Sequence, residues 1–283
     1  EYEVTPIEID DKNTKNVSII GADGFNHTFY IVNGVIKDYT IVPVDIRHVN
    51  GKHVINDFNF SGSNDNELDE NLREGLISYY KLDETSGGPM DSVGSNHAAN
   101  IGATQNVLGK VNSAYSFDMN DYIVISNDAS LNPTNAITIQ AWVYRDSTTG
   151  NHVAIIDKAS DGPASYFLYV RNDGTPYLTF AINRGGTGSG AYAQDIVRFP
   201  TGEWVHVVGT YDGSTIKLYR NGIEVANTPY NSNIIPSGNS LYIGRQGVGQ
   251  YWNGDIDEVG IWDKALSQEE VLQLYNNGDG LSY

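Results

Sequence analysis

After residue 75 the chain places apolar and polar residues in short alternating runs that recur about every 8 to 12 residues. The runs are rich in Val, Ile, Tyr and Phe, and Gly, Asn, Asp, Ser or Pro separates them. This pattern predicts the strands of an antiparallel sandwich or barrel rather than alternating strands and helices. The runs expected to form strands are LISYYKL, YSFDMNDYIVI, AITIQAWVYR, HVAIIDK, YFLYVRND, YLTFAINR, WVHVVGTYD, TIKLYRNGIEVA, SLYIGR and DIDEVGIW.

Two further hairpins are predicted nearer the N-terminus, in FYIVNGVIKDY (29–39) and DIRHVNGKHVI (45–55). Each centres Asn-Gly between apolar runs, and this dipeptide adopts the positive φ angles of a tight turn at low cost. We therefore expect a small β-hairpin domain over residues 1–60, followed over 61–75 by a polar segment that forms a linker or a short exposed helix. A unit of ~60 residues is marginal alone, so we expect it to anchor the protein in a homo-oligomer or a larger assembly.

The end of the chain is predicted to form one short helix. Ser267 is a suitable N-cap, and Glu270 three residues later completes a capping box. Val271, Leu272 and Tyr275 give the helix an apolar side, and the NNGDG sequence ends it. The fold class expected from these patterns is all-β, with residues 76–283 as one domain.

The charge of the chain excludes some partners. Lys and Arg total 17 against 35 Asp and Glu, a net charge of −18, which repels nucleic acid and anionic bilayers. No apolar run approaches the ~20 residues that span a membrane, so we expect no membrane insertion. The first residues do not have the form of a signal peptide, so an extracellular location requires a removed leader or a larger particle.

Seven segments give the second domain a family resemblance, and they occur in the family's order. Residues 76–283 resemble the laminin-G-like, concanavalin A-like jelly-roll family. The resemblance implies an antiparallel jelly-roll β-sandwich followed by the short C-terminal helix. The segments are GLISYYKLDETSG, DSVGSNHA, YSFDMNDYIVI, ITIQAWVYR, GEWVHVVGTYDGSTIKLYRNGIEV, SLYIGR and GDIDEVGIWDKALSQEEVLQLY.

The last predicted strand carries three carboxylates, Asp255, Asp257 and Glu258. Regular alternation puts Asp255 and Asp257 on one face and Glu258 on the other. Asp257 then lies on a face that becomes apolar, where a carboxylate requires a cation or hydrogen-bond donors. Pairing with Lys264 or Arg245 is one solution. Asp255 and Glu258 are expected at an edge or in solvent.

Calcium is the other solution, since it takes oxygen ligands from carboxylates, amides and backbone carbonyls. The resemblance implies a structural calcium ion where the loop after the first strand meets the last strand. Carried over to this sequence, side chains of Asp83, Asp91 and Asp257 would bind Ca²⁺, with Gly94 and Asn96 supplying backbone or amide oxygens. Pro89 and Met90 depart from the small polar residues of similar sequences.

Catalysis is not expected. Jelly-roll glycoside hydrolases need acidic residues at alternate positions of one strand, and DIDEV places its glutamate beside Asp257 instead. His206 is expected to be a core histidine that hydrogen-bonds a neighbour, since no second histidine stands at metal-ligand spacing. Asp173 and Asp212 lie in predicted turns.

Two glycine-rich loops, 183–195 and 244–254, combine aromatic and polar side chains suited to binding sugars. Trp252 has the alternative role of capping the core. The residues expected to contact a glycan or surface polysaccharide are Tyr192, Gln194, Arg245, Gln250, Tyr251 and Trp252.

Two functions of different classes follow. One is adhesion or recognition at an extracellular or virion surface, through glycan binding. The other is a structural decoration or fibre subunit of a bacteriophage or a bacterial surface assembly. The hairpin-rich first part favours assembly, and the aromatic loops favour recognition.

Overall fold

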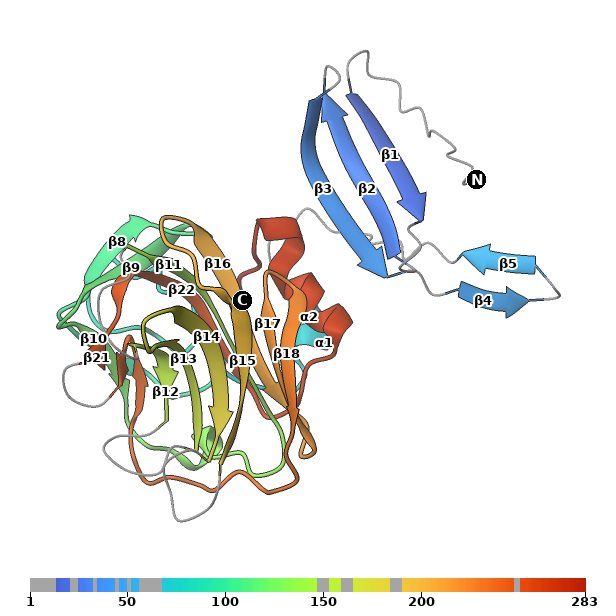
Figure 1. Ribbon diagram of the computed structural model, residues 1–283. Coiled ribbons are helices and arrows are strands. Elements are labelled where there is room, and N and C mark those ends of the chain that lie inside the picture. The colour runs from blue at the N-terminus through green and yellow to red at the C-terminus, as the bar shows by residue number, and fades with distance from the viewer. Residues whose placement is uncertain are drawn as a thin grey trace. The chain divides into compact units, whose positions relative to one another are not determined.

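The computed structural model divides the chain into two compact units, Glu1–Asp65 and Asn66–Tyr283. In the first unit it describes the backbone of the strands (Figure 1). In the second it describes residues 68–146, 153–158, 165–183, 190–246 and 250–283. The two units are treated separately below.

The first unit contains the two predicted hairpins. Strands β2 and β3 pair antiparallel with Val32 opposite Val35, and β4 and β5 pair with Val49 opposite Lys52. Both hairpins are therefore confirmed, while the anchoring role of this unit stays a prediction. The strands are β1 (Thr14–Ile20), β2 (Phe25–Val32), β3 (Val35–Pro43), β4 (Ile46–Val49) and β5 (Lys52–Ile55).

The second unit is a sandwich of two antiparallel sheets, and the predicted all-β jelly-roll class is confirmed. In the described part of the chain, one sheet has seven strands in the order β15-β14-β13-β12-β19-β10-β7. Their bounds are β7 (Ala98–Ile101), β10 (Tyr122–Ile125), β12 (Val153–Asp157), β13 (Tyr166–Asn172), β14 (Pro176–Ile182), β15 (Ala191–Arg198) and β19 (Leu241–Ile243).

The second sheet has eight described strands, in the order β18-β17-β16-β11-β22-β9-β8, with β6 also paired to β22. A separate two-stranded hairpin, β20-β21, follows β19. The bounds are β6 (Leu76–Tyr80), β8 (Thr104–Leu108), β9 (Ser113–Asp118), β11 (Ile137–Arg145), β16 (Trp204–Tyr211), β17 (Thr215–Arg220), β18 (Ile223–Pro229), β20 (Arg245–Gln246), β21 (Gln250–Tyr251) and β22 (Asn253–Trp262).

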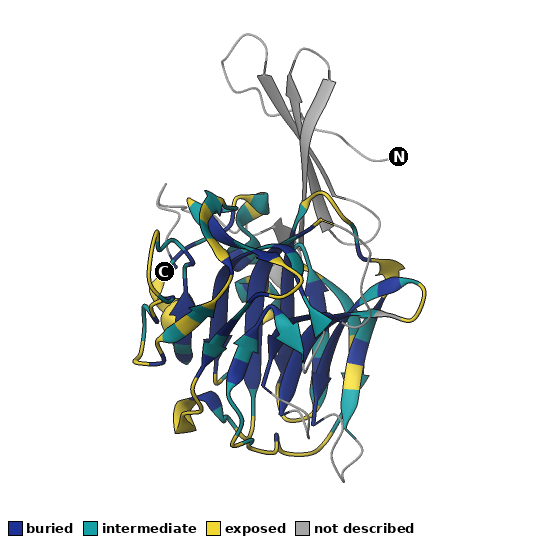
Figure 2. Ribbon diagram, turned by 90° about the vertical axis from the view of Figure 1, so that its left-hand side faces the viewer, coloured by how far each residue is buried: buried dark blue, intermediate teal, exposed yellow. Residues whose placement is uncertain are grey.

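One apolar core fills the space between the sheets, because alternate residues of each strand point inward. Buried residues run along the strands, and exposed ones gather at loops and edges (Figure 2). A second core lies on the outer side of the eight-stranded sheet, where α2 (Gln268–Tyr275) packs. It includes Leu72, Trp262, Val271 and Leu274.

The C-terminal helix begins as predicted. Ser267 and Glu270 form both hydrogen bonds of the capping box, and Asn276 ends α2 in a left-handed conformation. The structure also has a four-residue helix, α1 (Glu70–Arg73), and two 3-10 turns, η1 (Ala129–Leu131) and η2 (Asn276–Gly278). Of the described helices, none has the length and apolar character needed to cross a bilayer.

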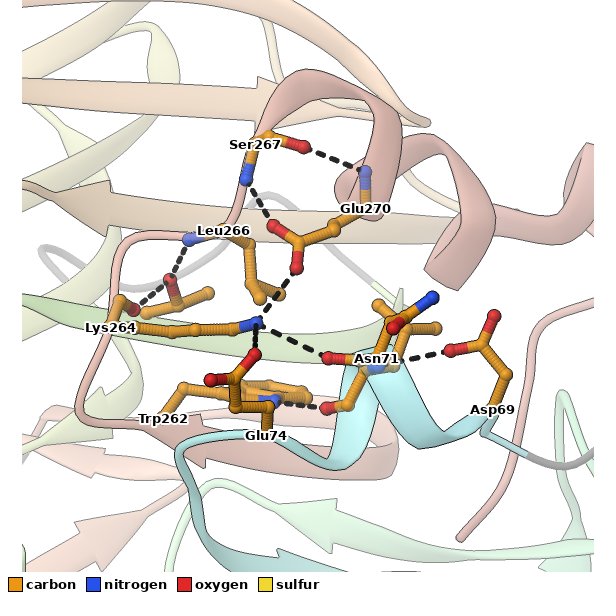
Figure 3. A network of polar contacts seen from close by, with 10 residues as sticks. Asp69, Asn71, Glu74, Trp262, Lys264, Leu266, Ser267 and Glu270 are labelled. Atoms are coloured by element: carbon orange, nitrogen blue, oxygen red, sulfur yellow. Dashed lines mark hydrogen bonds and ion pairs between the residues drawn. The ribbon is translucent and has the colours of Figure 1, made fainter.

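The segment predicted as a linker or a short exposed helix contains the helix α1, and residues 68–75 belong to the second unit and pack on the sandwich. The Trp262 indole donates a hydrogen bond of 2.6 Å to the Leu72 carbonyl, and Leu72 is fully buried. Lys264 donates to the Asn71 carbonyl (3.2 Å) and to Glu270 (2.8 Å), as Figure 3 shows. These contacts join α1, the end of β22 and the start of α2.

Lys158 is the most enclosed ammonium group of the described residues. Its side chain is fully buried at the end of β12, and it donates to Asn127 Oδ1 and to the carbonyls of Ser237 and Asn239. Burial lowers its pKa to about 8. The three oxygens tie two distant loops to β12, so this lysine compensates its buried charge by hydrogen bonding.

Lys158→Met should lower the free energy of unfolding by about 2 kcal/mol or more, because buried carbonyls lose their donor. Urea unfolding measures this loss. Lys217→Met is the control, since Lys217 forms only a surface ion pair with Glu224 (3.3 Å), and it should cost less than ~1 kcal/mol. Equal losses in the two variants would contradict this account.

Candidate functional site

The carboxylates of β22 are arranged by a β-bulge. Trp142 of β11 lies opposite Asp257, but Gln140 lies opposite Gly260, so Glu258 and Val259 together face one residue, Ala141. Glu258 has a φ of +48°, as a bulged residue can. Val259 enters the inner core, and Glu258 stays beside Asp257 on the outer side.

The prediction for Glu258 is therefore wrong. It is fully buried and does not point away from Asp257, because the bulge breaks the alternation on which the prediction relied. Neither of its carboxylate oxygens has a hydrogen-bond partner by distance and angle among the described residues. Burial raises the pKa of Glu258 well above its ordinary value, and the neighbouring Asp257 raises it further.

Asp257 is stabilised by backbone donors rather than by a basic side chain. Its Oδ2 accepts from the amides of Lys110 (2.8 Å) and Val111 (2.9 Å), and its Oδ1 accepts from the Glu258 amide (2.9 Å). Burial raises its pKa, and these N–H donors oppose that shift. Neither proposed partner pairs with it: Lys264 lies with Glu270, and Arg245 lies over tyrosines.

Asp255 is half-buried two residues before Asp257. It lies opposite Ser116 of β9 and Tyr144 of β11. Burial raises the pKa of Asp255, and the nearby Asp146 raises it further. Asp255, which was expected at an edge or in solvent, is therefore only partly exposed.

Asp91 and Asn96 form a hydrogen-bond network in the loop after β6, which we call the Asp91 network. Asp91 accepts from the Ser78 hydroxyl (3.0 Å) and from the amides of Tyr79 (3.0 Å), Val93 (3.1 Å) and Asn96 (3.1 Å). The Asn96 side chain donates to Ser78 (2.8 Å) and Ser130 (3.0 Å). The Asp91 carboxylate is therefore satisfied by donors of its own loop and of β6.

The predicted calcium ligands do not gather at one place. Asp91, Gly94 and Asn96 lie in the Asp91 network. Asp83 instead accepts a hydrogen bond from the Ser113 amide (2.9 Å), and its charge is close to Asp257. Across the residues described here, no group of three or more His, Cys, Asp or Glu side chains is arranged to hold a metal ion. The five-residue ligand set is thus not supported by the geometry, and calcium binding itself stays a prediction.

His206 is a core histidine, as expected. Its imidazole is fully buried, lies 5.1 Å from the Trp142 ring and is 2.8 Å from Gln140 Oε1 through Nε2. Because an amide oxygen only accepts, Nε2 carries the proton of the neutral ring. Burial lowers the pKa of His206 to about 3.

The two aspartates predicted in turns serve as turn residues. Asp212 accepts from the amides of Ser214 (2.8 Å) and Thr215 (2.7 Å). Asp173 forms an ion pair of 2.6 Å with Arg171.

Trp252 is not a ligand-binding residue. It is fully buried in the inner core, so the alternative role, capping the core, is the one that the structure shows. Its amide donates to the Gly244 carbonyl (2.8 Å), which closes the β20-β21 hairpin. Gly244 has a φ of +79° and lies so close to Phe117 that a Cβ would be 2.7 Å from the ring. Both ends of this hairpin are therefore fixed in the core.

Arg245 and Tyr251 meet two tyrosines that the sequence analysis did not single out. The Arg245 guanidinium lies 4.6 Å from the ring centroid of Tyr122, 4.9 Å from Tyr242 and 6.0 Å from Tyr251. Tyr122 and Tyr242 point away from the core, since their neighbours Ile123, Leu241 and Ile243 are buried. We call Tyr122, Tyr242, Arg245 and Tyr251 the tyrosine–arginine cluster.

This cluster lies on the outer face of the seven-stranded sheet, and all four side chains are partly exposed. Gln250 is beside it in the hairpin, opposite Gln246. Strand alternation contained the signal for Tyr122 and Tyr242, because Tyr122 precedes the buried Ile123 and Tyr242 lies between the buried Leu241 and Ile243. The meeting of the two strands with the hairpin was not visible in the sequence.

Tyr192 and Gln194 lie on the same outer face, but on β15, four strands from β19. At ~4.8 Å per strand the two groups are ~19 Å apart. Between them Ala154, Phe167, Tyr169 and Ala181 form a small buried cluster. The predicted ligand residues therefore form two separate groups.

A family model described as "Concanavalin A-like lectin/glucanases superfamily" matches residues 117–272, more than half of the chain. In sequence, 76 residues are 32% identical to pappalysin-1 of Mus musculus and of Homo sapiens. That match covers 25% of this chain and 5% of pappalysin-1.

Among solved structures, domain 4 of AbnA, an extracellular arabinanase from Geobacillus stearothermophilus, has a TM-score of 0.56 at 20% identity, over 70% of this chain and 97% of that one. The binding domain of Paraclostridial Mosquitocidal Protein 1 has a TM-score of 0.61 at 17% identity, over 73% and 53%. A botulinum neurotoxin type C structure has a TM-score of 0.56 at 13% identity, over 73% and 52%. These likenesses show a shared fold.

Asp257→Asn should lower the free energy of unfolding by about 2–4 kcal/mol, because an amide cannot accept from all three backbone donors. The loss should appear in EGTA, since the donors belong to the protein. Asp255→Asn is the control and should cost less than ~1 kcal/mol. A further loss confined to calcium buffer would place an ion on Asp257, and no loss in EGTA would contradict the role of the amides.

His206 should make the protein less stable in acid. Its folded pKa of about 3 lies below the ordinary ~6.5, so between these values the unfolded chain binds the extra proton. Its contribution is fully present above pH ~6.5 and is lost, by up to ~1.4 kcal/mol per pH unit, as the pH falls toward 3. In urea titrations the stability advantage over His206→Gln should shrink with falling pH; a constant difference would refute this assignment.

Proposed function

Because the chain belongs to the concanavalin A-like lectin/glucanases superfamily, we propose that its jelly roll is a non-catalytic glycan-binding module. The tyrosine–arginine cluster is the observation that carries this proposal. Three partly exposed rings and a guanidinium gather on one sheet face, and such rings present apolar surfaces with hydrogen-bonding edges, as sugars require.

The cluster is held in place before any ligand arrives. Arg245 lies over the faces of the rings, and the Tyr122 and Tyr242 centroids are 6.0 Å apart. Cation–π contact restricts these side chains, and the hairpin that carries Arg245 and Tyr251 is fixed in the core by Gly244 and Trp252. A preorganised surface loses less entropy on binding.

The structural neighbours favour the same class of ligand. The AbnA domain was solved in complex with arabinotriose, and entry of botulinum neurotoxin type C into cells depends on two ganglioside molecules. Both are sugar-containing ligands of proteins that share this fold.

The absence of catalysis is part of the proposal. Retaining and inverting glycosidases need two carboxyl groups that flank the bond to be cleaved. Here Asp257 accepts hydrogen bonds from three backbone donors, Glu258 is fully buried, and the Asp91 carboxylate accepts four hydrogen bonds within its own loop and β6. Asp257 and Asp91 thus serve as hydrogen-bond acceptors within the fold.

We further propose that the protein acts at an extracellular or virion surface, with the first unit as its anchor. The separate sheet of that unit, which has its own strand pairing, favours a modular chain in which one part attaches and the other is displayed.

Tyr242→Ala and Arg245→Ala should each weaken glycan binding by about tenfold or more, because each removes a central member of the cluster. A glycan array identifies a ligand, and calorimetry then measures its affinity for each variant. Tyr144→Ala is the matched control, since Tyr144 is a partly exposed tyrosine 5.8 Å from Trp204 on the other sheet. Equal loss in all three variants, or no ligand on the array, would refute the site.

A further inference from the structure

Two aromatic side chains are partly exposed on the outer face of the eight-stranded sheet, away from the tyrosine–arginine cluster. Tyr144 of β11 lies opposite Trp204 of β16, and their ring centroids are 5.8 Å apart with the planes inclined by 62°. Their neighbours Val143 and Val205 enter the inner core, so both rings point away from it. The pair therefore offers aromatic surface to a ligand.

A carboxylate lies beside the aromatic pair in the same row of the sheet. Asp255 of β22 is opposite Tyr144 on one side and opposite Ser116 of β9 on the other. The next residue, Ile256, enters the inner core, which leaves Asp255 on the outer face with the rings. Together with Trp204 these side chains form one row across four strands, and each of them is partly exposed. The row thus places aromatic, carboxylate and hydroxyl groups side by side on an accessible surface.

The carboxylates at this row have no basic partner. Burial raises the pKa of Asp255, and the charge of the exposed Asp146 raises it further. Within the described residues no ion pair involves either aspartate. One row further along β11, the Lys110 ammonium lies 4.9 Å from the Trp142 ring. This face of the sheet therefore already holds one cation over an aromatic side chain, and the row of Tyr144 has a ring and carboxylates for another.

Backbone hydrogen bonds hold this surface in place. The Asp146 amide donates to the Asn253 carbonyl (3.1 Å), and the Gly202 amide donates to the Arg145 carbonyl (2.9 Å). These bonds tie the end of β11 to the start of β22 and to the turn before β16. Gly202 has a φ of +77°, and a Cβ there would lie 3.9 Å from the Tyr144 hydroxyl. Because the three strand ends are joined, the rings and the carboxylate keep their spacing before a ligand binds.

We propose that Tyr144, Trp204 and Asp255 form a second binding site, which takes the protonated amine of an amino sugar. Trp and Tyr rings attract an ammonium group, and so does a carboxylate. A sugar adds an apolar face for the rings and hydroxyl groups for Ser116. The net charge of −18 also favours a cationic polysaccharide at long range. This inference extends the proposed glycan-binding function to a second ligand class, and it does not depend on the tyrosine–arginine cluster.

The test is calorimetry of the full chain at constant ionic strength, in mildly acidic buffer where the sugar amines are protonated. The probes are tetraglucosamine, its N-acetylated form and tetralysine. Wild type should bind tetraglucosamine about tenfold or more tightly than the acetylated form, because acetylation removes the charge and keeps the sugar chain. Tetralysine has the amines without the sugar rings, and it should also bind about tenfold more weakly.

Asp255→Asn should weaken tetraglucosamine binding by about tenfold, because the amide keeps the shape of the side chain and loses its charge. Tyr144→Ala should also lose this probe, and it should keep a neutral ligand of the tyrosine–arginine cluster. Tyr242→Ala should show the reverse pattern, which separates the two sites. Glu269→Gln is the matched control, since it removes one exposed carboxylate on α2, and it should bind as wild type does.

Several outcomes would overturn the inference. Equal affinity for the free and acetylated tetramers would show that the amine is not recognised, and equal binding of tetralysine would assign the surface to a peptide cation. Unchanged tetraglucosamine binding in Asp255→Asn would place that ligand elsewhere on this acidic chain. No tetraglucosamine binding, with a neutral glycan bound at the cluster, would refute this site and leave the proposed function intact. Tetraglucosamine binding that Asp255→Asn alone weakens, with no neutral glycan bound, would support this site and refute the cluster.

Discussion

The eight-stranded sheet depends on the bulge at Asp257 and Glu258. Strand β22 pairs with β11 along one side, but on the other side it pairs first with β9, over Asn253–Ile256, and then with β6, over Val259–Trp262. The change of partner falls at the two bulge residues. There the Asp257 carboxylate accepts hydrogen bonds from the backbone amides of the turn between β8 and β9. This side chain thus supplies a hydrogen-bond acceptor at the point where the backbone pairing of β22 is interrupted.

That constraint is consistent with a proposed binding surface that lies on the other sheet. Asp257 and Glu258, on the outer side of the eight-stranded sheet, are fully buried, and Asp257 accepts hydrogen bonds from three backbone amides. On the outer face of the seven-stranded sheet the four side chains of the tyrosine–arginine cluster are partly exposed in the part of the chain that the structure describes. The two sheets of the sandwich thus differ: one carries buried polar groups and the other carries the partly exposed aromatic groups of the cluster.

Local chemistry made much of this fold predictable. Asn-Gly located the hairpins, alternation located the strands, and Ser267 with Glu270 located the helix start, because each of these signals acts over a few residues. The errors came from contacts between distant segments. Alternation placed Glu258 wrongly, since one inserted residue reverses the faces, and nothing local showed that amides 147 and 146 positions earlier would meet Asp257. The polar segment before β6 looked like a linker because Leu72 is buried only by tertiary contacts.

The hairpin of β20 and β21 separates two properties that proteins often cannot change independently. Its ends, Gly244 and Trp252, belong to the packed interior, whereas Arg245 and Tyr251 stand just outside it. Substitutions of Arg245 and Tyr251 would alter the proposed recognition surface without opening the core. In evolution such a hairpin can therefore diversify its specificity at little cost to folding, and in the laboratory it is a natural position for a combinatorial library.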